Sequence, residues 1–149
     1  MLKALADAQN RFLVGGDPRE TWVDLLGHVL RLTGSTYGFI GEVQRAPGGR
    51  PTLRAHALTN VAWSPETQAL YEKHHTPEGF IFHKLDTLYG AVLTTGQTVI
   101  ANDPTHDPRR GGAPDGHPPL RAFLGLPLHR GHELVGMVGV ANRAGGYDD

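Results

Sequence analysis

The stretch ELVGMVGVANR, predicted as a strand over positions 133–143, decides the fold of this chain. Both of its alternating sets of positions are mainly apolar, so a strand here would be covered on both faces and lie in the interior of a sheet. Its small residues favour the close approach of a helix or a ligand. A turn at 130–132 joins it to a second apolar stretch over 121–129, which predicts an antiparallel hairpin.

Working outward, two more strands are predicted over 37–44 and 53–61, joined by a Pro-Gly-Gly turn. A short strand is predicted over 98–101. Helical spacing of apolar residues predicts helices over 17–33, ending before Gly34, and over 85–95, ending before Gly96. A further short helix is expected from 64 to 75. Hairpin-joined strands with helices between them indicate an α+β layered domain.

The composition fits one globular domain, with 149 residues, 39% of them hydrophobic and 19% charged. The net charge of −1 gives no electrostatic footprint for nucleic acid. No apolar run reaches the roughly 20 residues that span a bilayer. We therefore expect a cytoplasmic domain that neither binds nucleic acid nor inserts into a membrane.

Residues 1–16 are expected to form a separate N-terminal helix. Leu2, Leu5 and Phe12 are spaced like part of a heptad seam, which Gln9 interrupts. This pattern leaves two interpretations open. The helix packs on its own domain, or it is the end of a signalling helix that pairs two protomers into a homodimer.

Several segments together resemble the GAF domain, in particular the type found in bacterial sensor histidine kinases and related multidomain signalling proteins. They are LLGHVLRLTGSTYGFIGEV (25–43), LDTLYGAVLTTGQTVIAND (85–103), GHPPLRAFLGLPL (116–128) and ELVGMVGVANRAGGYD (133–148). The resemblance implies a GAF/profilin-like fold, a central six-stranded antiparallel sheet with helices on both faces. It also implies that 17–149 is a GAF domain whose final helix would follow Asp149.

The resemblance places a pocket between the sheet and two segments, 62–97 and 103–120. The second is a long loop rich in proline, a length typical of binding loops. Aromatic residues that could form apolar walls are Trp63, Phe80 and Phe82, with Tyr71 and Tyr89 as further candidates. The candidate polar contacts are His83, Asp86, Asn102, Asp103 and His117. His117 is the strongest, because it stands between Gly and Pro in a loop with no packing pattern to explain it.

Catalytic and cofactor chemistry finds little support in the residues. There is no Walker loop, no G-x-G-x-x-G fingerprint and no G-x-S-x-G elbow. The chain has no cysteine, which excludes a covalently attached bilin and the thiol chemistry of GAF domains that reduce methionine sulfoxide. The Asn-Lys-Phe-Asp-Glu signature of cyclic-nucleotide GAF domains is also missing. The histidines lack the spacing of a metal site, although haem needs only one axial histidine and stays open.

Two functions remain. The first is a non-enzymatic sensory domain that binds a small molecule, of unknown identity, and modulates an output domain such as a histidine kinase or a diguanylate cyclase. The alternative is a ligand-free module for dimerisation and signal relay. No cofactor can be named from the sequence.

Overall fold

The computed structural model describes residues 18–45, 47–59, 64–66, 68–69, 80–112 and 117–148. The helix expected within 1–16, and with it the expected homodimer seam, lies outside these residues and stays a prediction. Trp63 and Tyr71 also lie outside them, as does most of the short helix expected after residue 64.

The centre of the domain is a six-stranded sheet in the order β3-β2-β1-β6-β5-β4, and every neighbouring pair is antiparallel. Its strands are β1 (Tyr37–Arg45), β2 (Pro51–Leu58), β3 (Phe80–Phe82), β4 (Val99–Ala101), β5 (Phe123–Arg130) and β6 (Glu133–Ala141). The interior position predicted for the strand over 133–143 is confirmed, since β6 lies between β1 and β5 and is buried from Gly136 onward.

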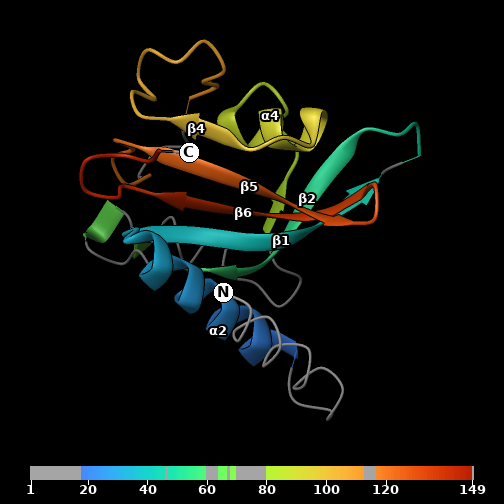
Figure 1. Ribbon diagram of the computed structural model, residues 1–149, viewed down its shortest axis with the longest axis horizontal. Coiled ribbons are helices and arrows are strands. Elements are labelled where there is room, and N and C mark those ends of the chain that lie inside the picture. The colour runs from blue at the N-terminus through green and yellow to red at the C-terminus, as the bar shows by residue number, and fades with distance from the viewer. Residues whose placement is uncertain are drawn as a thin grey trace.

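Helices cover both faces of this sheet, as predicted. Helix α2 (Pro18–Thr33) lies against one face and helix α4 (Leu88–Thr95) against the other (Figure 1). Each helix has its own core. Leu26 packs with Ile40 and Val138 on the α2 face, and Val92 packs with Leu53 and Met137 on the α4 face.

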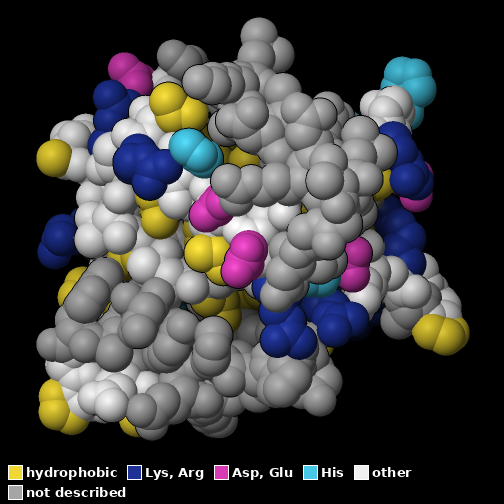
Figure 2. Space-filling model, turned by 90° about the horizontal axis from the view of Figure 1, so that it is seen from below, with side chains coloured by type: hydrophobic (Ala, Val, Ile, Leu, Met, Phe, Trp, Pro, Cys, Tyr) yellow, Lys and Arg dark blue, Asp and Glu magenta, His cyan; other side chains and the backbone are white. Residues whose placement is uncertain are grey.

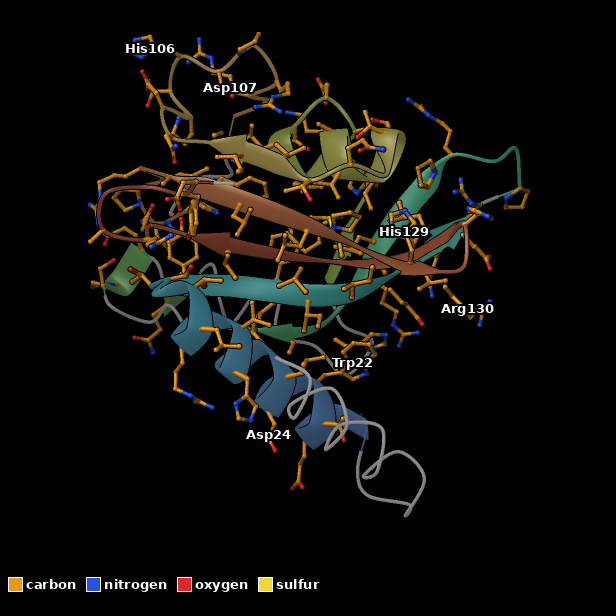
Figure 3. All side chains as sticks on the ribbon, in the orientation of Figure 1. Trp22, Asp24, His106, Asp107, His129 and Arg130 are labelled. Atoms are coloured by element: carbon orange, nitrogen blue, oxygen red, sulfur yellow. The ribbon has the colours of Figure 1, made fainter. Side chains whose placement is uncertain are left out.

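Helix α2 is amphipathic along its whole length. Trp22 points toward the sheet and stacks on His56 with ring centroids 5.1 Å apart, whereas Asp24 points away (Figure 3). His56 also lies 3.3 Å from the Glu42 carboxylate. Acidic and basic side chains are interspersed on this side of the molecule (Figure 2). The apolar side of α2 is buried against the sheet, and this burial holds the helix in position.

Helix α4 begins and ends at caps that the sequence carries. The Thr87 hydroxyl accepts a hydrogen bond from the Gly90 amide at 3.0 Å, which satisfies a donor of the first turn. Gly96 adopts a left-handed φ of 67° and closes the C-terminus. The predicted end was right, but the predicted start at Leu85 was early because Thr87 is the cap.

Several strand boundaries differ from the prediction. β6 ends at Ala141 and not at 143, and β3 was not predicted from the residues. β2 ends at Leu58. The next residue, Thr59, still donates its amide to the Gly38 carbonyl at 3.0 Å, and its hydroxyl bonds to Gly38 at 3.0 and 3.2 Å. β5 begins at Phe123 because the side-chain oxygen Oδ1 of Asn142 accepts the amide of Arg121 at 2.7 Å. Asn142 itself turns the chain with φ 62°, so it has a structural role.

Candidate ligand cavity

A cavity of about 1050 Å³ lies on the α4 face of the sheet. Its floor is the start of β1 and the end of β6, and its sides come from three segments, the β3–α4 connection and the loop segments 104–112 and 117–120. These are parts of the two segments that the family resemblance had placed around a pocket. The cavity is therefore built by pieces that are far apart in the sequence.

The floor is shaped by the ring of Phe39, which lies over Gly139. A Cβ at Gly139 would collide with this ring, so only glycine leaves room for it here. Phe39 stacks on Phe82 at 4.7 Å, and Phe82 meets Tyr89 edge to face at 4.9 Å. The small residue that we expected to admit a helix or ligand instead admits a cross-strand aromatic side chain.

The β3–α4 connection is held by its own polar groups. The Tyr89 hydroxyl accepts a hydrogen bond from the Lys84 amide at 3.2 Å, and the Thr87 hydroxyl donates to the Lys84 carbonyl at 2.7 Å. Burial raises the pKa of Tyr89, so its hydroxyl is neutral at pH 7. These two hydroxyl groups already have partners within the protein.

The segment 104–112 is attached to the rest of the domain at two points. The Lys84 ammonium donates to the Gly111 carbonyl at 2.8 Å, and a Cβ at Gly111 would collide with the backbone of Asp86. Arg109 forms an ion pair with Asp107 at 2.8 Å and donates to the Ile100 carbonyl of β4 at 3.0 Å. Hydrogen bonding to Arg109 lowers the pKa of Asp107. This part of the predicted loop is thus fixed.

Residues 117–120 form the remaining side. Tyr37 is only 8% exposed, its hydroxyl donates to the Pro119 carbonyl at 3.4 Å, and its ring meets that of His117 edge to face at 6.0 Å. Burial raises the pKa of Tyr37, and nearby Arg121 only partly opposes this. The Asn142 amide also donates to the Pro119 carbonyl, at 2.7 Å.

Three of the predicted site residues come together here. Phe82, His83 and His117 all line the cavity. Phe80 lies in β3 opposite Ala55, and its side chain is not described. Trp63 lies outside the described residues.

The three predicted residues with carboxylate or amide side chains lie elsewhere. The Asn102 amide forms a pair of 2.8 Å hydrogen bonds with the backbone of Tyr147, one in each direction. Asp103 pairs with His106 at 2.9 Å on the exposed loop, and the Asp86 side chain is exposed outside the lining. Asn102 therefore holds residues 142–148 against the end of β4.

The sequence interpretation missed Lys84 and Arg110, the two permanently cationic side chains of the lining. No local pattern marks them, because the fold alone brings these distant segments together. It also missed Tyr37 and Phe39 as lining residues. Their alternation along a predicted strand could have placed them on one face.

Two neutral observations complete the description. Among the described residues, no group of three or more His, Cys, Asp or Glu side chains is placed to hold a metal ion. In the same part of the chain, no helix has the length and apolar character needed to cross a membrane.

Comparison with known proteins identifies relatives of this arrangement. The chain is 28% identical over 122 residues to a methyl sulfide methyltransferase-associated sensor of Methanosarcina acetivorans, covering 80% of this chain but 11% of that relative. The GAF domain of a phosphoenolpyruvate-protein phosphotransferase from Coxiella burnetii has a TM-score of 0.64 and 14% identity, over 95% of this chain and 77% of that one.

A third similar structure is a type II free methionine-R-sulfoxide reductase from Thermoplasma acidophilum, with a TM-score of 0.56 and 12% identity over 84% of this chain and 74% of that one. Both solved structures show likeness of fold alone. The sequence model of the GAF domain matches residues 16–149, nearly the whole chain. On that match and on its six-stranded sheet, the chain belongs to the GAF domain family.

Proposed function

We propose that this domain is a non-catalytic sensor that binds a small, largely apolar molecule and modulates an output domain of a longer protein, such as a histidine kinase or a diguanylate cyclase. The cavity of about 1050 Å³ carries the proposal. Pockets for small molecules usually measure about 300–1,000 Å³ and are lined mainly by apolar and aromatic side chains. The rings of Phe39, Phe82 and Phe123 give this lining that character.

The way the cavity is closed supports a sensory role. The β3–α4 connection and the segment 104–112 form two sides of the cavity. They are joined by single contacts, such as the Lys84–Gly111 hydrogen bond at 2.8 Å. A ligand that binds one arrangement of such contacts more tightly than another shifts their equilibrium. The relative from Methanosarcina acetivorans carries the word sensor in its name, which agrees with this role.

The lining also supports the absence of catalysis. The Thr59 and Thr87 hydroxyls are committed to backbone groups, and His117 Nδ1 lies 2.7 Å from the Pro118 carbonyl oxygen. An activated nucleophile needs a base within hydrogen-bond reach. The chain has no cysteine to supply the thiol chemistry expected of a methionine sulfoxide reductase.

Filling the cavity tests the proposal. Leu120 lines the cavity and is partly buried, so Leu120→Trp places a large ring inside it. A panel of neutral and charged aromatic compounds is screened by thermal shift, and hits are confirmed by isothermal titration calorimetry. We expect hits to bind the unmodified protein and to lose at least tenfold in affinity with Leu120→Trp.

Val23→Trp is the matched control, because Val23 is 58% exposed on α2, across the sheet from the cavity. It should leave affinity unchanged. If no compound of the panel binds, or if hits bind Leu120→Trp as well as the unmodified protein, the cavity is not a sensory site.

A further inference from the structure

The charges around the cavity are unbalanced. Among the described residues its lining contains two cations, Lys84 and Arg110, and two histidines, but no Asp or Glu. The carboxylates of Asp86, Asp103 and Asp107 lie outside the lining. Asp103 pairs with His106, and Asp107 pairs with Arg109.

Two hydroxyl groups of the cavity walls are already bonded within the protein. The Thr59 hydroxyl bonds to both backbone groups of Gly38, and the Tyr89 hydroxyl accepts from the Lys84 amide. A ligand whose body carries many polar atoms would lose its bonds to water and gain few in return. The interior therefore suits a ligand body that is apolar.

The cations behave differently, because they lie exposed at the rim and retain free donors. Among the described residues, Lys84 Nζ makes one hydrogen bond, to Gly111, out of the three that an ammonium can donate. Arg110 precedes Gly111 in the sequence and is exposed. Within the described part of the chain, its guanidinium has no hydrogen bond or ion pair. A guanidinium matches a carboxylate with two parallel hydrogen bonds.

We infer that the ligand is an apolar, aromatic carboxylate whose ring lies among the apolar side chains of the lining and whose carboxylate is bound by Lys84 and Arg110. The inference rests on the proposed function, since it names the chemical class that the same cavity takes. The aromatic side chains of the lining, among them Phe123, favour an aromatic ligand body.

The test compares naphthalene-2-carboxylate with naphthalene-2-carboxamide, a neutral compound of nearly the same shape. Affinities are measured by isothermal titration calorimetry at pH 7.5 in 50 mM salt. We expect the carboxylate to bind at least tenfold more tightly than the amide. Raising the salt to 500 mM should shrink this preference and leave the affinity of the amide unchanged, because salt screens charges near the surface.

The double variant Lys84→Gln/Arg110→Gln should lower the affinity of the carboxylate to that of the amide. Arg109 keeps its bonds to Ile100 and Asp107 in this variant, so the segment 104–112 stays attached. The matched control is Arg45→Gln/Arg130→Gln, which removes the same charge from the opposite end of the sheet, where Figure 3 shows Arg130. The control should retain the full preference.

Each outcome separates the inference from the proposed function. Equal affinities for carboxylate and amide, or a preference that survives both the double variant and high salt, would overturn the inference while the cavity remains a ligand site. Failure of both compounds and of the whole aromatic panel would overturn the proposed function with it. If the double variant does not fold, the salt dependence of the unmodified protein decides.

Discussion

The two faces of the sheet carry helices of very different length. Helix α2 has 16 residues and α4 has 8, so at about 1.5 Å per residue they extend roughly 24 and 12 Å. The long helix covers its face with one continuous apolar stripe. The short helix leaves part of its face to the connecting segments, and the cavity lies under them. The comparison shows how one sheet provides a sealed core on one side and a binding space on the other.

The polar contacts follow the same division. On the α4 face, side chains of Lys84, Thr87 and Arg109 bond to backbone groups of the segments around the cavity. Such contacts fix the position of a segment without filling the space beneath it. On the α4 face, side-chain hydrogen bonds therefore fix the connecting segments in place. On the α2 face, apolar packing of the helix fixes the helix in place.

The largest expected effect compares the loss of stability caused by leucine truncation in the core of the α2 face with that beside the cavity on the α4 face. Leu26→Ala should lower the free energy of unfolding by about 3–4 kcal/mol, since Leu26 is 3% exposed and its removal leaves a closed void. Leu88→Ala should cost about 2 kcal/mol, because Leu88 lines the cavity and its removal only enlarges a space that already exists. Urea denaturation measures both. A larger loss for Leu88→Ala would contradict the contrast between the faces.

A smaller effect is expected at Asn102, which links the end of β4 to Tyr147 in the core of the α2 face. Asn102→Ala removes two hydrogen bonds and should lower the free energy of unfolding by about 2 kcal/mol. The affinity of a cavity ligand should not change. Asp103→Ala is the control, because an exposed pair with His106 contributes little. If Asn102→Ala weakens ligand binding and Asp103→Ala does not, Asn102 contributes to the ligand site after all.

The smallest effect concerns Tyr37 and appears only at alkaline pH. Burial raises the pKa of Tyr37 in the folded protein above the ordinary value of about 10. The unfolded chain releases this proton first, so the stabilisation is complete below about pH 10 and is lost as the pH rises toward the folded value. We expect Tyr37→Phe to cost less than about 1 kcal/mol at pH 8, since the lost hydrogen bond is long.

At pH 11 the difference between Tyr37→Phe and the unmodified protein should shrink or reverse sign. Urea denaturation at both values measures it, and absorbance at alkaline pH reports how many tyrosines ionise before unfolding. Tyr89, whose pKa is also raised by burial, should keep part of the pH dependence in the variant. Equal differences at the two pH values would show that Tyr37 ionises as freely in the folded state as in the unfolded one.

How far the sequence predicts this molecule depends on whether a signal is local. The interior position of β6 and the end of α4 at Gly96 follow from patterns within a few residues, and both are confirmed. The partner of Asn102 lies 45 residues further along the chain, so Asn-Asp-Pro reads only as a turn. The hydrogen bond of Lys84 to Gly111, next to Arg110, also joins residues that lie far apart in the sequence, 27 positions from one another. No local pattern could predict it.

The hydrogen bond from Arg109 to Ile100 also has a consequence for the protein at high concentration. β4 is an edge strand, and the exposed backbone of an edge strand is a template on which another chain can add. The Arg109 guanidinium, paired with Asp107, donates a hydrogen bond to the Ile100 carbonyl. A charged side chain therefore lies along that edge. The segment that bounds the cavity thereby also protects the sheet from edge-to-edge aggregation.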